Sequence, residues 1–381
     1  VLAKAANLKV IGRAGAGVDN IDSEESTNRG IIVMNTPGGN TVAATEHTIA
    51  MMLSLMRNIP RANMSILEEK WDKKKYIGNE LFEKTIGVVG LGKIGYGVAK
   101  RLKAFDATIL GYDPIVTKEM ADRIGVKLVD LDELVEKSDI ITIHAPKMPE
   151  TIDLFNKDRL AKCKDGVVIV NCARGGIVNE ADLLAALESE KVSAAALDVY
   201  SSEPLTDYEL AKHPNVVATP HLGASTQEAQ EKVADMILDQ MSEYFEKNVA
   251  RNAVNFVSVD EEIQPIIAPY FELAQRLGKI FSQGKKGRLQ EVSIRFYGDI
   301  INLPVEPISA HLMVGALQGA ETELVNPVNS LAICSESGIS IEIAKKDLAL
   351  TSHTNVIACD FKTDEGFYHF SGTVFAKDQF H

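Results

Sequence analysis

Short apolar segments alternate with amphipathic ones from residue 8 to about residue 250. The apolar segments are rich in β-branched residues, which is typical of buried parallel strands, and we predict strands at 8–11, 31–34, 86–89, 108–112, 139–143, 167–170, 194–197 and 216–218. Helical periodicity predicts helices at 41–56, 98–105, 131–137 and 180–190. Asp130 and Asn179 are expected to cap the last two, and Ser225 with Glu228 forms a capping box that opens a helix to about Lys247. This alternation predicts an α/β fold with a doubly wound parallel sheet, whose ligands bind beyond the carboxyl ends of the strands.

The pattern changes after Asn255. Helical periodicity at 265–282 and 307–317 is combined with alternating strand patterns at 291–297, 340–344, 355–361 and 367–375. Such a combination predicts a separate α+β domain. The sequence of this region contains no recognisable catalytic cluster, so packing or regulation is its expected role.

The most specific motif lies between two of the predicted strands. The strand at 86–89 runs into Gly90-Leu91-Gly92-Lys93-Ile94-Gly95, a helix follows, and the next strand ends at Asp113. The first glycine allows the tight turn, the second lets a pyrophosphate approach the backbone, and the third lets helix and strand pack closely. Asp113 lies 23 residues after Gly90 (113 − 90), near the spacing at which a carboxylate accepts from adenosine ribose hydroxyls, and it would repel a 2′-phosphate. We therefore predict an NAD site rather than an ordinary glycine-rich turn.

Three polar residues follow predicted strands at the same edge of the sheet: Arg174, Glu203 and His221. The guanidinium of Arg174 can bind a carboxylate with two parallel hydrogen bonds. His221 can remove a hydroxyl proton while a hydride leaves for a nicotinamide, and Glu203 can hold the imidazole and fix its tautomer. Taken singly, each has an ordinary alternative: a salt-bridged arginine, a glutamate in a turn and a capping histidine. Taken together they suggest a dehydrogenase site, in which the cofactor does the redox chemistry.

Other segments leave two interpretations open. The loop at 12–20 contains three glycines within six residues and is either an anion site or a plain connection. Glu46 and His47, on the helix at 41–56, are expected to be a satisfied core pair rather than catalytic. Trp71, the only tryptophan, is either an anchor for a partner or packed under its own loop. Lys73–Lys75 either meet a phosphorylated substrate or form a solvated face.

The composition excludes several classes of function. The chain has 381 residues, of which 45% are hydrophobic and 24% charged, and a formal net charge of −13. This length implies two or three domains, and an acidic chain without a recurring basic stripe argues against nucleic-acid and anionic-membrane partners. The four cysteines have neither metal nor disulfide spacing, so we expect free thiols in a reducing compartment and no metal. The sequence shows no apolar run of transmembrane length and no leader, so the cytoplasm is the expected location, and the opening on Val1 suggests a fragment.

Eight stretches of the chain are shared with one family: GRAGAGVDNID (12–22), MNTPGGNTVAATEH (34–47), WDKKKYIGNEL (71–81), VVGLGKIG (88–95), GYDP (111–114), NCARGGIVNE (171–180), ALDVYSSEP (196–204) and PHLGAST (220–226). Through them the chain resembles the D-isomer-specific 2-hydroxyacid dehydrogenases over residues 1 to about 255. The resemblance implies Arg174 as substrate binder and electrophile, Glu203 as the partner of His221, and His221 as proton donor and acceptor.

The glycine motif and the resemblance together imply NAD contacts at a set of loop residues: Ala16, Gly90, Gly92, Lys93, Ile94, Gly95, Asp113, Ala145, Cys172, Ala173, Arg174, Asp198, His221, Leu222, Gly223 and Ala224. Two of these, Ala16 and Ala145, replace hydroxyl residues that are common in the family, which removes side-chain donors but not backbone contacts. On the substrate side the resemblance implies Ala14, Gly15 and Asn40. Arg13 is added because its charge suits a phosphorylated acid.

One branch of this family, whose members oxidise 3-phospho-D-glycerate to 3-phosphohydroxypyruvate in serine biosynthesis, is the most similar. The resemblance therefore implies that NAD-dependent reaction. Its alternatives are a dehydrogenase for 2-hydroxyglutarate or glycerate, and a non-enzymatic, NAD-sensing corepressor that binds partner peptides. The expected partners are a small phosphorylated 2-hydroxy acid and further copies of the chain in a homodimer or homotetramer.

The resemblance also divides the chain into three domains. Residues 1–37 and 226–256 form a discontinuous, partial flavodoxin-like substrate domain whose opening strand–helix units are absent. Residues 38–225 form the NAD-binding Rossmann domain, and 257–381 resemble the intervening, allosteric-type domain that precedes a regulatory domain in some members. The chain ends where that regulatory domain would begin, so feedback by serine is not expected.

Overall fold

The computed structural model describes residues 1–259, 262–318, 325–346, 355–376 and 379–380. Contacts divide the chain into two compact units: unit 1 is Val1–Pro37 with Val233–His381, and unit 2 is Gly38–Lys232. The boundary at residue 232 falls inside helix α10, Gln227–Lys247. The three-domain division derived from the sequence stays a prediction. Among the described residues, none of the helices combines the length and the apolar character that crossing a bilayer requires.

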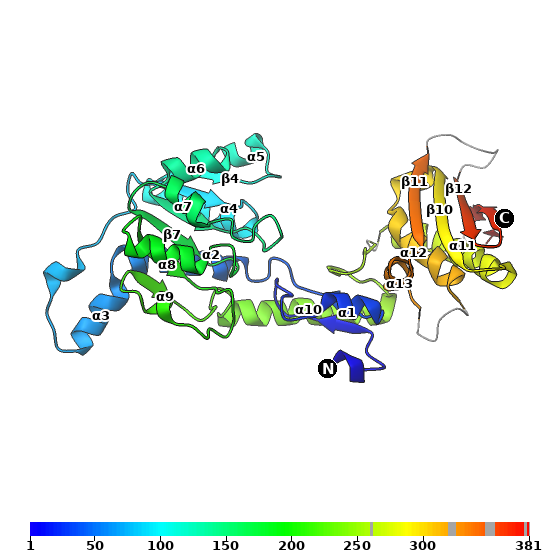
Figure 1. Ribbon diagram of the computed structural model, residues 1–381, viewed down its shortest axis with the longest axis horizontal. Coiled ribbons are helices and arrows are strands. Elements are labelled where there is room, and N and C mark those ends of the chain that lie inside the picture. The colour runs from blue at the N-terminus through cyan, green and yellow to red at the C-terminus, as the bar shows by residue number, and fades with distance from the viewer. Residues whose placement is uncertain (260–261, 319–324, 347–354, 377–378, 381) are drawn as a thin grey trace. The chain divides into compact units, whose positions relative to one another are not determined.

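Unit 2 is built on a seven-stranded parallel sheet with the order β5-β4-β3-β6-β7-β8-β9. Two of its strands, β4 and β7, are labelled in Figure 1. The chain enters at β3, winds outward through β4 and β5, returns to β6 beside β3 and then winds outward to β9. This is the doubly wound order, which confirms the predicted fold class. The strands are β3 Thr85–Val89, β4 Thr108–Tyr112, β5 Lys127–Leu128, β6 Ile140–Ile143, β7 Val167–Asn171, β8 Val192–Leu197 and β9 Val216–Ala218.

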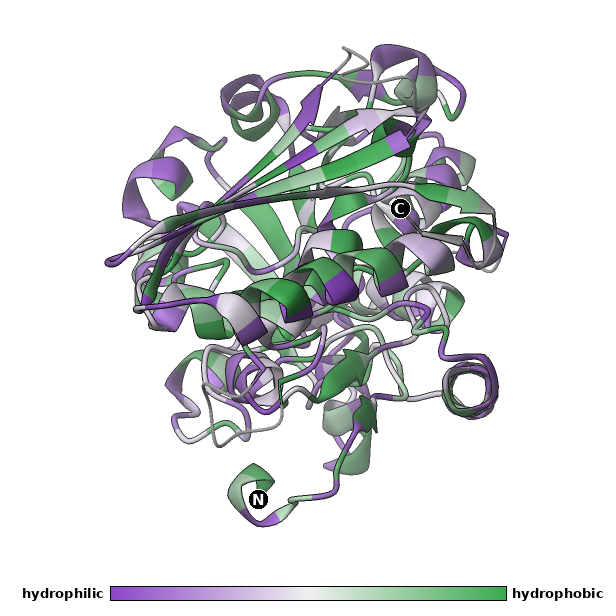
Figure 2. Cartoon of the chain, turned by 90° about the vertical axis from the view of Figure 1, so that its right-hand side faces the viewer, coloured by the Kyte–Doolittle hydropathy of each residue, from purple (hydrophilic) through white to green (hydrophobic). Residues whose placement is uncertain are grey.

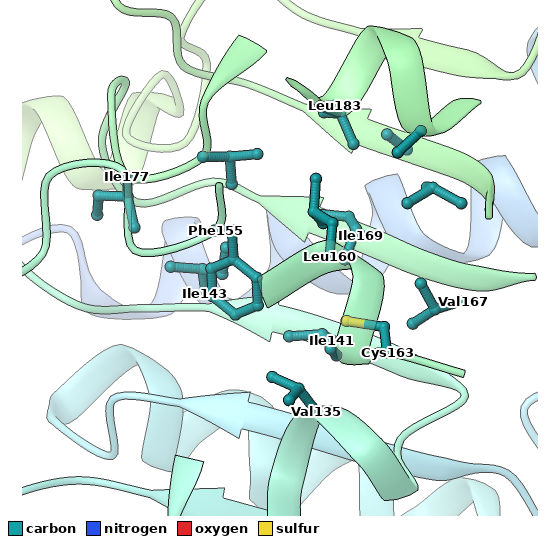
Figure 3. Packing of buried hydrophobic residues seen from close by; sticks show 14 of the residues in the cluster. Val135, Ile141, Ile143, Phe155, Leu160, Cys163, Val167, Ile169, Ile177 and Leu183 are labelled. Atoms are coloured by element: carbon teal, nitrogen blue, oxygen red, sulfur yellow. The ribbon is translucent and has the colours of Figure 1, made fainter. Parts of the chain in front are cut away.

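Helices cover both faces of this sheet, because the strands present apolar side chains to both faces. On one face α2 (Thr41–Met56) and α4 (Lys93–Leu102) pack over strand residues such as Ile86 and Val88. On the other face lie α6 (Leu131–Lys137), α7 (Lys157–Lys162) and α8 (Glu180–Glu188). Figure 3 shows this second cluster, in which Ile141, Ile143 and Ile169 face helix and loop residues.

The predicted elements of unit 2 are largely found, with differences at short or loop-linked segments. α4 begins at Lys93 rather than Val98, because the helix starts directly from the glycine loop. Several helices were not predicted, because they are too short or too exposed for a clear periodicity: α3 (Ile59–Leu67), α5 (Lys118–Asp122), α7 and α9 (Glu209–Lys212), with the 3₁₀ turn Lys73–Tyr76. The end of the helix predicted at 98–105 is a 3₁₀ turn, Lys103–Phe105. The capping box at Ser225 is wrong, since α10 begins at Gln227 and the Thr226 hydroxyl accepts from Ala229 N at 3.1 Å.

In unit 1 the opening segment depends on residues far along the chain. Strands β1 (Val10–Gly12) and β2 (Ile32–Met34) pair in parallel, with helix α1 (Ser23–Asn28) between them and a 3₁₀ turn at Leu2–Lys4 before them. The Asn255 side chain accepts from Val33 N at 2.8 Å and donates to Ile31 O at 2.9 Å. An amide that donates and accepts in this way acts as one more strand residue beside β2.

The C-terminal part of unit 1 is an α+β arrangement, as predicted. Its four-stranded sheet has the order β11-β10-β12-β13, in which β10 and β11 are parallel and the other pairs antiparallel. In Figure 2 these strands alternate hydrophobic and hydrophilic residues, as expected of a sheet with one covered face. The elements are α11 Gln264–Gly284, β10 Leu289–Gly298, the 3₁₀ turn Asp299–Asn302, α12 Val305–Ala316, α13 Ser330–Glu336, β11 Ser340–Lys346, β12 Asn355–Thr363, β13 Phe367–Gly372, β14 Val374–Ala376 and β15 Gln379–Phe380.

Helices α11 and α12 meet through glycines, backbone against backbone. A Cβ on Gly278 would lie 2.1 Å from Leu312 O, and a Cβ on Gly315 would lie 2.1 Å from Gln275 O. We expect Gly278→Ala to force the helices apart and lower the free energy of unfolding of this region by about 1–3 kcal/mol. Hydrogen exchange in α11 and α12 measures this.

The matched control is Gly284→Ala at the end of α11, where a Cβ would meet nothing within 4 Å. That change should be neutral or slightly stabilising. Equal protection of α11 and α12 in both variants would contradict the close crossing.

Candidate active site

The three glycines of the loop after β3 have three different environments. Gly90 has a φ of +89°, and a Cβ there would lie 2.7 Å from His144 O. A Cβ on Gly95 would lie 1.9 Å from Gly90 O, so helix and strand touch here. A Cβ on Gly92 would meet nothing within 4 Å, and this residue is the N-cap of α4. The space beside Gly92 at the start of α4 is therefore open, which fits a pyrophosphate at a helix N-terminus.

Asp113, at the end of β4, joins the glycine loop to the next turn. Its Oδ2 accepts from Leu91 N at 2.8 Å, and its Oδ1 accepts from Ile115 N at 2.8 Å and Val116 N at 3.1 Å. The residue is partly exposed. An ionised carboxylate has about four acceptor positions, so one is left for a hydroxyl of a ribose.

His144, directly after β6, packs against the glycine loop. The His144 Nε2 lies 3.0 Å from Thr142 Oγ1. A Cβ on Gly95 would lie 3.3 Å from the Cβ of His144. Burial lowers the pKa of His144 from 6.5 to about 4. The folded protein therefore keeps this ring neutral at pH values where the unfolded chain protonates it.

We expect this difference to make unit 2 less stable in mild acid. The free energy of unfolding is undiminished by His144 above pH 6.5. It falls as the pH drops from 6.5 toward 4, because only the unfolded state takes up the proton in that range. Between pH 7 and pH 5 the free energy of unfolding should fall by about 2 kcal/mol from this group. Urea unfolding at the two pH values, with His144→Gln as the comparison, measures it. An equal pH dependence in both proteins would contradict the assignment.

The loop that carries Arg174 is shaped by Asn171 at the buried end of β7. The Asn171 side chain accepts from Ala173 N at 3.1 Å and donates to Arg174 O at 3.0 Å. A Cβ on Gly175 would lie 1.7 Å from Tyr200 O, so a larger residue there would displace the loop. Arg174 is partly exposed, and its Nη1 donates to Ala173 O at 2.8 Å.

Glu203 and His221 form a direct pair in the structure. His221 Nδ1 lies 2.7 Å from Glu203 Oε2, and Glu203 Oε1 accepts from Tyr200 N at 3.0 Å. Because an ionised carboxylate only accepts, the proton of the neutral ring belongs on Nδ1, and Nε2 is left as the acceptor. Both residues line a cavity of about 630 Å³ together with Tyr200, Leu205, Tyr208 and Pro220.

Asp198, directly after β8, is fully buried and bonded to the same turn. Its carboxylate accepts from Thr219 Oγ1 at 2.6 Å, Leu222 N at 2.7 Å and Gly223 N at 2.8 Å, and His47 Nε2 lies 3.1 Å from it. Burial alone would raise the pKa of Asp198, but the hydrogen bonds from His47, Thr219 and Leu222 lower it below its ordinary value. The group is therefore a buried anion, and its cofactor contact stays a prediction.

The other predicted residues divide between the two units. In unit 2, Lys93, Ile94, Ala145, Cys172, Ala173, Leu222, Gly223 and Ala224 follow carboxyl ends of the parallel strands, and Asn40 precedes α2. Burial, with the charge of Asp198, raises the pKa of the Cys172 thiol to about 12, so this thiol is neutral. Arg13, Ala14, Gly15 and Ala16 belong to unit 1, after β1.

Sequence reasoning missed several residues that shape the site. Of the expected core pair, Glu46 is exposed and lies 3.7 Å from Arg101, while His47 is bonded to Asp198. Tyr200 and Thr219 were not singled out, although both hold the His221 turn. Both residues lie next to the ends of predicted strands, but the linear sequence does not show which strand ends are neighbours in the sheet. Trp71 is 84% exposed, so it is not packed under its own loop.

Two family models match the chain. The model described as "D-isomer specific 2-hydroxyacid dehydrogenase, NAD binding domain" matches residues 49–223, and the "D-3-phosphoglycerate dehydrogenase intervening domain" matches residues 266–381. The D-3-phosphoglycerate dehydrogenase of Methanocaldococcus jannaschii is 38% identical over 375 residues, which are 98% of this chain and 71% of that protein. The chain belongs to the D-isomer-specific 2-hydroxyacid dehydrogenase family. This confirms the resemblance inferred from the sequence, including its NAD-binding domain.

One further relative and two solved structures are matched over 66% to 83% of their own length. The D-3-phosphoglycerate dehydrogenase of Archaeoglobus fulgidus is 46% identical over 91% of this chain and 66% of that protein. The chain thus spans slightly less than two thirds of that relative. Among solved structures, D-lactate dehydrogenase from Aquifex aeolicus, complexed with NAD and lactic acid, has a TM-score of 0.62 and 30% identity over 68% of this chain and 83% of that one. The NAD-dependent formate dehydrogenase of Staphylococcus aureus, in complex with NAD, has a TM-score of 0.59 and 38% identity over 64% of this chain and 74% of that one.

Proposed function

We propose that this family member interconverts 3-phospho-D-glycerate and 3-phosphohydroxypyruvate with NAD, the first step of serine biosynthesis. The observation that carries the proposal is the Glu203–His221 pair at 2.7 Å, in a chain with a dinucleotide loop and relatives named D-3-phosphoglycerate dehydrogenase. Bound NAD would accept the hydride from C2 of the substrate.

The residues of unit 2 fit that cofactor. The N-terminus of α4 beside Gly92 would hold the pyrophosphate, and Asp113 would accept from the adenosine ribose. A carboxylate at that position disfavours the 2′-phosphate of NADP by charge repulsion. The remaining contacts, at Ala145, Cys172 and the turn after β9, are proposed on the family resemblance.

The chain's own residues would carry out the proton transfer. His221 Nε2 would take the proton of the C2 hydroxyl, because Nδ1 is engaged by Glu203. Glu203, held by Tyr200 N, orients the ring. Arg174 would bind the substrate carboxylate through its two-pronged guanidinium. In the reverse direction the same Nε2 returns the proton to the keto oxygen.

The positive charge of Arg13 favours a phosphorylated acid as the substrate. Arg13 donates to Ala14 O next to it, and its Nε is buried without a hydrogen-bond partner among the described residues. Gly15 N donates to Thr36 Oγ1 at 2.8 Å, which fixes the loop that Arg13 precedes. We propose Arg13, Ala14, Gly15 and Asn40 as substrate-side residues.

The test is NADH oxidation with 3-phosphohydroxypyruvate, run beside hydroxypyruvate and 2-oxoglutarate. We expect kcat/KM to be highest for the phosphorylated acid and to fall sharply when its phosphate is removed. Preference for 2-oxoglutarate would assign the chain to another 2-hydroxy acid. Binding of short peptides in the presence of NAD, with no turnover of any acid, would favour the corepressor class.

We further propose that the chain acts as a homo-oligomer. Trp71 is exposed, and so are Ile59, Met64, Leu67 and Ile77 on the segment around it. Apolar surface of this kind is typical of protein–protein contacts. Light scattering should give a mass of at least two chains, and Trp71→Ala should shift the equilibrium toward smaller species. An equal mass in both proteins would show that the indole is not part of the contact between chains.

We place the protein in the cytoplasm because all four thiols are free, which cell fractionation tests.

A further inference from the structure

The proton-transfer residue sits on a strained turn. His221 has a φ of +56°, in the left-handed region that residues with a Cβ rarely adopt. Such a conformation persists only where its surroundings hold it in place. The turn therefore needs fixed contacts on both sides of His221.

Those contacts converge on Asp198. Before His221, the Thr219 hydroxyl donates to Asp198 Oδ1 at 2.6 Å, and the Tyr200 hydroxyl donates to Thr219 O at 3.1 Å. After His221, Leu222 N and Gly223 N donate to the two oxygens of Asp198 at 2.7 and 2.8 Å. One buried carboxylate thus binds the chain on both sides of the histidine.

The carboxylate in turn has a partner from another element. His47, on α2, places Nε2 3.1 Å from Asp198 Oδ1 and 3.3 Å from Thr219 Oγ1. Since the Thr219 hydroxyl already donates to Asp198, the proton on His47 Nε2 is best placed on the carboxylate as well. Without that donor, a fully buried anion loses one of the bonds that offset its desolvation.

We propose that His47 is a positioning residue for the reaction. By donating to Asp198, it keeps the carboxylate where it holds the His221 turn, and so keeps His221 Nε2 aligned for proton transfer. His47 acts through Asp198 and the turn, to which its Nε2 is bonded. This inference rests on the proposed function for its kinetic part only.

The experiment compares His47→Leu, His47→Gln and Glu46→Gln. Glu46 is the neighbour of His47 on α2 and is exposed, so its variant is the matched control. We expect His47→Leu to lower kcat about 10-fold, the size of a lost hydrogen bond to a charged group. Its solvent deuterium isotope effect on kcat should rise, because misaligned proton transfer becomes rate-limiting. His47→Gln should recover most of the rate, since its amide can donate to the same oxygen, and Glu46→Gln should match the wild type.

Hydrogen exchange supplies a readout that needs no turnover. Loss of the His47 bond should speed exchange in the peptide containing Leu222 and Gly223, whose amides bond to Asp198. The Glu46→Gln variant should leave that peptide unchanged.

The results that would overturn the role of His47 differ from those that would overturn the proposed function. Wild-type rate, isotope effect and exchange in His47→Leu would overturn the inference. A lower rate with an unchanged isotope effect, unchanged exchange in the turn and no recovery in His47→Gln would also overturn it, since α2 packing alone would then account for the loss. If the wild type turns over no keto acid, the proposed function fails, while the exchange of Leu222 and Gly223 still decides whether His47 holds the turn.

Discussion

Replacing His221 with asparagine should lower kcat for keto-acid reduction by about 10²- to 10⁴-fold, the usual contribution of a positioned general acid or base. Asparagine is chosen because it tolerates the left-handed backbone of this residue, with its φ of +56°, better than most residues do. The turn is then kept while the proton donor is removed. NADH binding, measured by fluorescence titration, should stay close to that of the wild type.

The control for this change is His213→Asn, at another histidine of unit 2, whose Nδ1 accepts from Asn215 N at 3.2 Å. It lies before β9 rather than after it, and its loss should leave turnover unchanged. If His221→Asn kept the wild-type kcat, His221 would have no part in proton transfer. A large loss of NADH affinity would point instead to a binding role.

Arg174→Lys should lower kcat/KM for the keto acid by about 10²- to 10³-fold, comparable to losing one preorganised donor in an active site. Lysine keeps the charge but not the planar pair of donors, so a carboxylate could no longer be bound through two parallel bonds. The loop itself should persist, because Asn171 bonds its backbone and Gly175 packs against Tyr200 O. Steady-state kinetics over a range of keto-acid concentrations measure the change.

Arg159→Lys is the matched control, because Arg159 forms a surface ion pair with Asp132 at 3.0 Å. Surface pairs contribute little, so this variant should behave as the wild type. Full activity of Arg174→Lys would mean that a single positive charge suffices at this position. The bidentate binding mode would then be excluded.

The architecture of unit 2 was readable from the sequence because buried parallel strands leave a direct signal. Continuous apolar runs such as 167–170 are typical of such strands when amphipathic segments separate them. The glycine loop was readable for a similar reason, since each glycine answers a separate steric demand. Gly90 needs a positive φ, Gly95 touches Gly90 O, and Gly92 faces open space.

The contacts that hold the site together were not readable in this way. Asp198 and His47 are far apart in the sequence, and no periodicity connects a helix residue with a strand end. The tight environment of Gly175 depends on Tyr200 O, which belongs to a different loop. Short helices such as α5 and α9 left too few residues for a pattern. These features depend on how strands are ordered in the sheet, which local sequence does not state.

The tie between Asn255 and β2 has a consequence for synthesis of the chain. Asn255 and Ile31 are 224 positions apart, and the apolar side chains of β1 and β2 pack against Ile237 and Ala250. At about 5–20 residues per second, a ribosome needs on the order of tens of seconds to make the intervening segment. Unit 2 lies wholly within that interval. It can therefore fold on the nascent chain while the first 37 residues still wait for their partners, with Val10, Ile32 and Met34 accessible to chaperones until the residues around Asn255 emerge.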